Sequence, residues 1–251
     1  LGNKFLSHIR ECDAICHVVR LFSDDNIIKA GSVDPKSDFE TVKIELDLAD
    51  LEMEQKHKEK KKKNEEEVEL PLFSQKPILI VLNVDEKDLI NAVDLEKQWA
   101  REFNIKPEQV TAICAKTEME LADLDPAEQV AYLKDLDVKK SGLERLIQKA
   151  FATLGLMTFL TAGEKEVRAW TIKKGSTAPQ AAGVIHTDFE KGFIKASVVS
   201  YEDFIGGKEG LPAEALAKAG WKKCMESGKV RQEGRDYQMQ DGDVVEFKFS
   251  S

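Results

Sequence analysis

Short apolar runs and amphipathic segments alternate along the first 155 residues of the chain. The run Ile78-Leu79-Ile80-Val81-Leu82 is wholly apolar, as expected for a parallel strand covered on both faces. Apolar runs predict strands at residues 15–22, 77–83 and 109–115. Apolar residues at helical spacing predict helices at 3–13, 94–103, 127–136 and 141–153. This alternation favours right-handed βαβ units in a doubly wound parallel sheet.

The pattern changes after about residue 156. Strands are expected at residues 157–161, 167–172 and 193–201, and helices at 179–186 and 211–227. The last segment, 237–249, has the pattern of a hairpin that turns at Asp241-Gly242. Strands with packed helices but no βαβ alternation indicate a separate, small α+β domain.

Between these regions lies a long, highly charged helix. Asp34-Pro35 is a helix start signal, and Phe39, Val42 and Leu46 then share one face. The helix runs into a block of lysines and glutamates at residues 56–67. Such a block is usually a solvated helix extension, and the alternative is an electrostatic handle for a partner. We therefore expect a projecting helical arm.

Charge is unevenly distributed over the 251 residues. The net charge is -9, whereas residues 156–251 carry 14 basic and 14 acidic side chains, so the excess acid lies in the first part. This balance argues against broad coating of nucleic acid but leaves room for a local basic patch. The four cysteines form no CxxC pair, which favours a reducing compartment over a zinc site. No apolar run is long enough to span a bilayer, and no signal peptide is recognisable.

Candidate chemistry lies where two predicted strands end. Asn83-Val84-Asp85-Glu86 follows one strand, and Cys114-Ala115-Lys116-Thr117 ends the next. In open α/β sheets, ligands bind beyond the carboxyl ends of the strands. The two loops resemble the base-recognition pair of Ras-like nucleotide-binding domains. Taken alone, the first tetrad could equally be an exposed turn between strand and helix.

The tetrad departs from the pattern that selects guanine. Val84 and Glu86 stand where Asn-Lys-x-Asp has its lysine and aspartate. Glutamate is longer by one methylene, so its carboxylate is displaced from the position that accepts from guanine N1–H and the exocyclic amine. Adenine offers an acceptor at N1, where a carboxylate would lack a donor. The tetrad therefore argues against strict guanine specificity.

Further strings resemble the Obg-like ATPase (YchF) family over nearly the whole chain. They are LGNKFLSHIR at 1–10, GSVDP at 31–35, FLTAG at 159–163, EVRAWTI at 166–172, APQAAG at 178–183 and HTDFEKGFI at 186–194. The resemblance implies a Ras-like nucleotide-binding domain at 1–35 and 74–155, a coiled-coil arm at 36–73 and a C-terminal β-grasp (TGS) domain at 156–251. It also implies ATP and Mg as cofactors, ATP hydrolysis, and binding to the ribosome and ribosomal RNA in the cytoplasm. It implies neither DNA nor a membrane as a partner, and a monomer is favoured.

Two features depart from that family. The chain contains no Gly-x-x-x-x-Gly-Lys-Ser/Thr loop, which holds phosphates and magnesium in P-loop proteins. There is also no initiator methionine, so we expect the P-loop and both switches to precede Leu1, and the arm to be shortened. We therefore expect no catalytic residue and no metal ligand in this segment, and nucleotide contacts only on the base side. The expected contacts are Asn83, Val84, Glu86, Ala115 and Lys116.

An alternative from another class is a ribosome- or RNA-docking module without nucleotide turnover. The aromatic residues Trp170, Phe189, Phe193 and Tyr201 could stack on RNA bases, although the simpler expectation is that they form the core of the small domain. His186 and Asp188 could suggest a metal or catalytic pair, but an isolated His-x-Asp is more often a packed turn.

Overall fold

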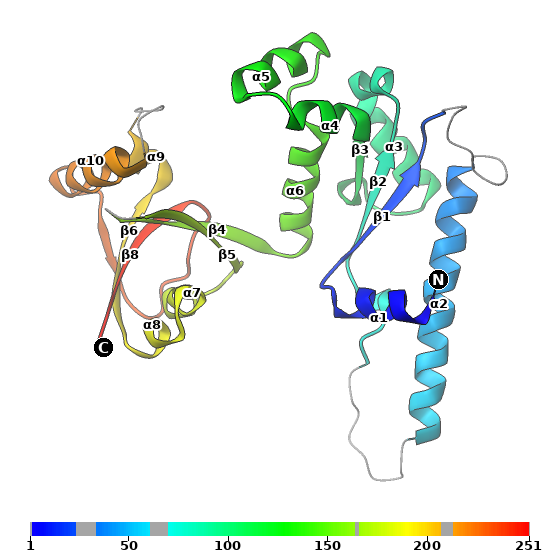
Figure 1. Ribbon diagram of the computed structural model, residues 1–251. Coiled ribbons are helices and arrows are strands. Elements are labelled where there is room, and N and C mark those ends of the chain that lie inside the picture. Colours follow the sequence, from blue (N-terminus) through cyan, green and yellow to red (C-terminus); the bar gives the residue numbers. More distant parts are fainter. Residues whose placement is uncertain (1, 24–33, 61–69, 164–165, 207–212, 251) are drawn as a thin grey trace. The chain divides into compact units, whose positions relative to one another are not determined.

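The computed structural model describes residues 2–23, 34–60, 70–163, 166–206 and 213–250 (Figure 1). The chain forms two compact units, Leu1–Leu154 and Gly155–Ser251. Their division lies one residue from the boundary expected after residue 155. The unit 1 sheet is parallel and the unit 2 sheet is mostly antiparallel, which gives a mixed α/β protein.

Unit 1 contains a parallel sheet in the order β1-β2-β3. Its strands are β1 (Ile15–Arg20), β2 (Ile78–Asn83) and β3 (Val110–Ile113). The helices are α1 (Asn3–Glu11), α2 (Pro35–Lys60), α3 (Ala92–Glu102), α4 (Ala115–Ala122), α5 (Pro126–Asp135) and α6 (Gly142–Thr153). Short 3-10 turns lie at η1 (Phe73–Gln75), η2 (Glu86–Asn91) and η3 (Pro107–Gln109).

The core of unit 1 lies between the sheet and helices α2 and α3. Figure 1 shows α2 running alongside β1. Phe39 of α2 stacks on Phe103, next to the end of α3, with ring centroids 4.4 Å apart. Ile80 and Leu82 of β2 are fully buried in the same cluster. Burial of each such side chain contributes about 1.5–3 kcal/mol, so packing contributes substantially to this arrangement.

The outer edge of β3 is bound by charged side chains. Glu96 of α3 accepts the N–H of Ala112 at 3.0 Å, and Arg145 of α6 donates to the Ala112 carbonyl at 2.6 Å. Lys149 donates to the carbonyl of Val110. Glu96 also pairs with Arg145 at 2.5 Å and with Lys149 at 2.8 Å. The three side chains, which we call the edge triad, take the place of a neighbouring strand.

The beginning of the expected arm is the 26-residue helix α2. Asp50 of α2 accepts the backbone N–H groups of Phe73 and Ser74, both at 2.9 Å. Arg10 of α1 lies 3.6 Å from Asp50 and 4.1 Å from the centroid of the Phe73 ring. These contacts fix the returning chain against the helix. Most of the charged block lies in residues 61–69, outside the described residues.

Unit 2 has a five-stranded sheet in the order β5-β4-β8-β6-β7. Its strands are β4 (Leu156–Ala162), β5 (Val167–Lys173), β6 (Phe193–Ser200), β7 (Arg231–Glu233) and β8 (Asp243–Phe249). Its helices are α7 (Ala178–Ile185), α8 (Thr187–Lys191), α9 (Tyr201–Ile205) and α10 (Ala213–Glu226). One core cluster lies against α7 and α8, and a second joins α9 and α10 to the sheet. The sheet therefore carries helices on both faces (Figure 1).

The structure corrects the expected C-terminal hairpin. Residues 237–240 form no strand, and Gln238 makes only an isolated bridge to Thr177. The Asp241 carboxylate accepts the Thr158 N–H at 2.8 Å, and Gly242, at φ 79°, donates its N–H to the Thr158 carbonyl at 2.8 Å. The turn is thus bound to β4, and β8 pairs with β4 and β6 instead. The sequence pattern also missed the short elements α4, α8, α9 and β7.

Candidate functional site

The carboxyl ends of the three parallel strands of unit 1 meet at Asn83. The Asn83 side-chain oxygen accepts the backbone N–H of Ala115 at 3.1 Å. The backbone carbonyl of Asn83 accepts the N–H groups of Leu21 at 2.8 Å and Phe22 at 3.1 Å, two residues just beyond β1. Because parallel strands end at the same sheet edge, the two loops expected to read a base lie side by side. Asn83 connects all three strand ends.

Val84 is placed differently from the expectation that it contacts a ligand. Its side chain is only 2% exposed and belongs to the unit 1 core. Its backbone N–H donates to the Ile113 carbonyl at 2.9 Å. In this arrangement Val84 positions the loop through burial and a backbone bond, and offers neither its side chain nor its N–H to a ligand.

The other three expected residues lie near the sheet edge with access to solvent. Glu86 is exposed and begins η2 directly after the Asp85 cap. Ala115 and Lys116 form the first turn of α4 rather than a loop, because the helix begins immediately after Cys114. The Lys116 side chain is 74% exposed and pairs with Glu120 one turn later, at 3.9 Å. The start of a helix adds a positive dipole end to this edge.

Tyr132 of α5 is a further polar group near this edge that the sequence pattern did not reveal. Its hydroxyl donates to the Glu120 carboxylate at 2.6 Å. That hydrogen bond, with smaller contributions from burial and from the charges of Glu120 and Glu86, raises the pKa of Tyr132 to about 12. The negative charge of Glu86 in η2 therefore acts on the Tyr132 hydroxyl of α5. Nothing in the local sequence around Tyr132 indicates this, because the contact joins separate helices.

Two other side chains at the edge also escaped the sequence analysis. Phe22 lies just beyond β1, and the Arg20 guanidinium stacks over its ring at 4.4 Å from the centroid. Thr117, in the first turn of α4, is 1% exposed, and its hydroxyl has no hydrogen-bond partner among the described residues. An aromatic ring at a strand end was detectable in the sequence, but its position beside Asn83 was not.

The His186-x-Asp188 segment is the exposed start of α8 rather than a packed turn, since the two side chains are 58% and 73% exposed. His186 caps α8, and its Nδ1 accepts the Asp188 backbone N–H at 3.2 Å. Within the described ranges, no group of three or more His, Cys, Asp or Glu side chains could hold a metal ion. No described helix has the length and apolar character needed to cross a membrane.

Comparison with known proteins identifies relatives of both units. Residues 156–250 match the family model YchF-GTPase_C, described as "Protein of unknown function (DUF933)". The chain is 42% identical to the "Ribosome-binding ATPase YchF" of Bacillus subtilis over 294 aligned positions, covering all of this chain and 76% of that protein. It is 37% identical to "Obg-like ATPase 1" of Gallus gallus, covering all of this chain and 72% of that protein.

A solved structure supports the same relationship. The Schizosaccharomyces pombe "YchF GTPase" superposes with a TM-score of 0.77 at 30% identity, over 99% of this chain and 75% of that one. The names of these proteins differ in the nucleotide, with ATP in the two relatives and GTP in the solved structure. The alignment to the Bacillus protein extends over 294 positions while this chain has 251 residues, so that relative contains internal residues with no counterpart here. From the identity, the coverage and the superposition together, the chain belongs to the family of YchF and Obg-like ATPases.

Proposed function

We propose that unit 1 provides the base side of an ATP site in a ribosome-binding ATPase. The observation that carries the proposal is the bond between the Asn83 side chain and the Ala115 N–H, at 3.1 Å. It joins the two loops that follow β2 and β3, at the sheet edge where nucleotides bind in open α/β folds. The names of the relatives support an ATPase and a ribosomal partner.

Each proposed contact uses a group of the side chain that is not engaged within the described part of the protein. The Asn83 oxygen is engaged by Ala115, and no described residue accepts from its amide nitrogen, which can donate to an acceptor on a purine edge. Glu86 disfavours guanine because its side chain is one methylene longer than that of aspartate, so its carboxylate is displaced. Ala115 and the alkyl stem of Lys116 provide a surface for the flat face of the base. Val84 acts indirectly by fixing the loop.

The phosphate side of the site requires residues that these 251 do not include. No Gly-x-x-x-x-Gly-Lys-Ser/Thr loop occurs in the chain. We propose that the intact protein carries this loop and thereby holds the triphosphate and Mg. Bound ATP–Mg supplies the phosphoryl group that is transferred to water. This segment by itself is therefore expected to bind nucleotide poorly and not to hydrolyse it.

We further propose that unit 1 is part of a Ras-like domain, that α2 is the base of a shortened coiled-coil arm, and that unit 2 is a TGS domain. The parallel sheet of unit 1 and the helix-covered sheet of unit 2 are consistent with this. A cytoplasmic monomer that binds ribosomal RNA, and not DNA, completes the proposal. The ribosome-binding names of the relatives support the ribosomal partner in this proposal.

Nucleotide titration tests the base assignment. The protein, in the longest form that its gene encodes, is titrated with fluorescent ATP and GTP analogues. We expect ATP to bind about thirtyfold more tightly than GTP, which corresponds to about 2 kcal/mol from lost or unpaired base hydrogen bonds. Glu86→Asp should narrow the ratio by raising GTP affinity, and Asn83→Ala should weaken both nucleotides. Asp94→Asn, at an exposed position in α3, serves as the control.

Equal affinities of the unaltered protein for ATP and GTP would show that the tetrad does not select adenine. An unchanged ratio in Glu86→Asp would have the same meaning. Val84→Lys is a poor test, because it would bury an ammonium group where the side chain is 2% exposed.

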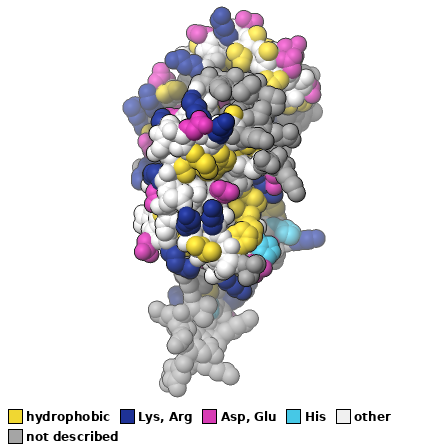
Figure 2. Space-filling view, turned by 90° about the vertical axis from the view of Figure 1, so that its left-hand side faces the viewer, with side chains coloured by type: hydrophobic (Ala, Val, Ile, Leu, Met, Phe, Trp, Pro, Cys, Tyr) yellow, Lys and Arg dark blue, Asp and Glu magenta, His cyan; other side chains and the backbone are white. Residues whose placement is uncertain are grey.

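The second candidate is a docking module without turnover. Unit 2 carries exposed lysines at Lys173 and Lys174, beside a shallow depression of about 550 Å³. On the face drawn in Figure 2, basic side chains occur in small groups among acidic and apolar ones. Ribosome binding that persists in the absence of any nucleotide, with no hydrolysis by the intact protein, would favour this candidate over an ATPase.

A further inference from the structure

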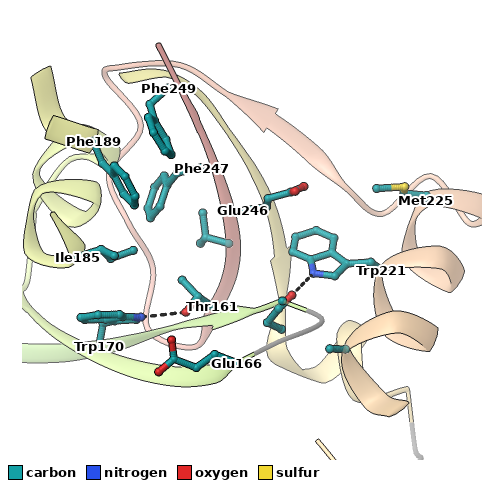
Figure 3. Close-up of a pocket in the computed structure, with 14 residues that line it drawn as sticks. Thr161, Glu166, Trp170, Ile185, Phe189, Trp221, Met225, Glu246, Phe247 and Phe249 are labelled. Atoms are coloured by element: carbon teal, nitrogen blue, oxygen red, sulfur yellow. Dashed lines mark hydrogen bonds between the residues drawn. The ribbon is translucent and has the colours of Figure 1, made fainter. Parts of the chain in front are cut away.

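The sheet of unit 2 has an opening between β4 and β8. A cavity of about 570 Å³ lies there, and helices from both faces of the sheet contribute to its lining. Ile185 and Phe189 come from α7 and α8, and Trp221 and Met225 from α10 on the other face (Figure 3). A cavity reached from both faces requires that the sheet itself is open at this point.

Strand pairing explains the opening. β4 and β8 pair in parallel at only one position, Leu160 with Val244. Beyond it, β8 continues to Phe249 and pairs only with β6. Ala162, the last residue of β4, directs its carbonyl to the Trp221 indole N–H at 2.8 Å instead of to a strand.

The side of β8 that faces the opening is consequently a free strand edge. Its odd and even side chains, Phe247 and Glu246, both line the cavity, so the cavity surrounds this edge. In an antiparallel pair, every second residue directs its N–H and C=O away from the partner strand. Among the described residues, no strand pairs with the side of residues 245–249 that faces away from β6.

The lining is aromatic and acidic. Trp170, Trp221, Phe189 and Phe249 provide rings, and Phe189 and Phe249 stack with centroids 3.8 Å apart. Both indole N–H groups are engaged internally, since Trp170 donates to the Thr161 hydroxyl at 2.9 Å (Figure 3). Among the described residues that line the cavity, the charged ones are Glu166 and Glu246, and none is a lysine, arginine or histidine.

Neighbouring cations modify this picture only in part. Arg168 pairs with Glu166 at 3.7 Å and stacks over Trp170 at 4.2 Å from the centroid, but it is not a lining residue. Lys248 follows Glu246 two positions along β8 and also lies outside the lining. Glu246 is exposed and has no ion-pair partner among the described residues. The cavity therefore favours a cation next to aromatic rings.

We propose that the opening binds an extended, basic segment of a partner protein, which adds as a strand to the free edge of β8. Backbone hydrogen bonds to that edge provide affinity, as in other cases of strand addition. A lysine or arginine of the segment lies against Glu246 beside Trp221, and its apolar neighbours enter the aromatic lining. Nucleic acid is disfavoured, because the charged groups that phosphates would meet among the described lining residues are two carboxylates.

Synthetic peptides with the full chain provide the test. A fluorescently labelled peptide of alternating valine and lysine should raise its anisotropy on binding, and it should quench or shift the emission of Trp170 and Trp221. The same peptide with glutamate in place of lysine should not bind. Methylation of alternate backbone nitrogens should abolish binding while the charge is retained, because it blocks strand pairing.

Matched variants locate the contact. Glu246→Gln should weaken binding of the lysine peptide about fivefold, the factor for one partly exposed ion pair. Glu202→Gln, at an exposed position on α9 outside the cavity, should leave it unchanged. Equal binding of the glutamate or the methylated peptide would overturn the proposal. Absence of binding by the lysine peptide would overturn it as well. So would displacement of the bound peptide by single-stranded RNA, if Glu246→Gln left that displacement unchanged.

Discussion

Individual polar residues in this protein stabilise turns as much as strands. In unit 2, Asp243 is only 3% exposed and accepts from the Tyr237 hydroxyl at 2.8 Å and from the Gln240 N–H at 2.9 Å. Arg231 donates to the same tyrosine hydroxyl at 3.0 Å. Burial, followed by the hydrogen bond to Asp243, raises the pKa of Tyr237 to about 12. This network replaces the hairpin that the sequence pattern predicts.

The Tyr237 network predicts a stability loss at high pH. The folded protein holds the phenol protonated up to about pH 12, whereas an unfolded tyrosine ionises near pH 10. The stabilisation is therefore complete below about pH 10 and is lost as the pH rises towards 12. Tyr237→Phe should cost about 1 kcal/mol at pH 8, allowing for the partial solvent exposure of the ring, and nearly nothing at pH 12.

Urea unfolding followed by tryptophan fluorescence measures this difference at each pH. Tyr201→Phe is the control, because the Tyr201 side chain is 49% exposed and no described side chain bonds its hydroxyl. A cost for Tyr237→Phe that stays constant from pH 8 to pH 12 would show that the hydroxyl does not titrate late in the folded state.

At the level of elements, the edge triad holds α3 and α6 against β3. Glu96 is 6% exposed, and it receives one backbone N–H and two cations. Glu96→Ala should lower the free energy of unfolding by about 2–3 kcal/mol, because it leaves the Ala112 N–H without an acceptor and removes the counter-charge of two partly buried cations. Urea denaturation of both variants is the measurement, and Glu102→Ala is the matched control on the same helix.

Glu102 has a side chain that is 49% exposed and pairs with Lys36 at 3.5 Å, so its removal should cost less than about 1 kcal/mol. Similar losses for the two glutamates would mean that the edge triad adds little stability beyond a surface ion pair.

Elements were predictable where one pattern dominates, and not where distant side chains decide. The apolar run of β2 identified a central strand, and Ser141 marked the start of α6, where its hydroxyl accepts the Glu144 N–H at 3.0 Å. The expected hairpin was wrong because the Asp241 carboxylate bonds β4, 83 residues away in sequence. The short helix α4 was missed because it starts directly at a strand end.

The candidate site follows the same rule. The loop at Asn83 and the segment at Ala115 were identified as neighbours because both follow strands of one parallel sheet. The burial of Val84 was not foreseeable, since it depends on packing against α3 and β3 and on the bond to Ile113. The position of Tyr132 near the site could be recognised only from its contact with Glu120 in another helix.

At the scale of the whole molecule, charge divides along the chain. The net charge is -9, yet the last 96 residues carry as many basic as acidic side chains. A ribosome-binding surface on such a protein must be a local basic patch that meets phosphate, so binding should weaken steeply as salt increases. Co-sedimentation with ribosomes over a salt series is the measurement. The candidate lysines are Lys173, Lys174, Lys191 and Lys195, together with the arm lysines at 60–63.

Reversal of the four unit 2 lysines to glutamate should reduce ribosome binding at low salt by at least tenfold and flatten the salt dependence. A control with the same change in net charge reverses four exposed lysines of unit 1: Lys87, Lys97, Lys134 and Lys139. Equal losses in both variants would indicate an effect of overall charge rather than a defined patch. Binding that does not respond to salt would contradict an electrostatic interface.

The edge triad has a consequence for how the sheet of unit 1 can be extended. At the β3 edge no further strand can pair, because side chains already bind the backbone groups that an additional strand would need. The other edge of the sheet is β1, and there Val18 remains 60% exposed on one face. In the part of the sheet that the structure describes, an additional parallel strand can therefore pair next to β1 but not next to β3.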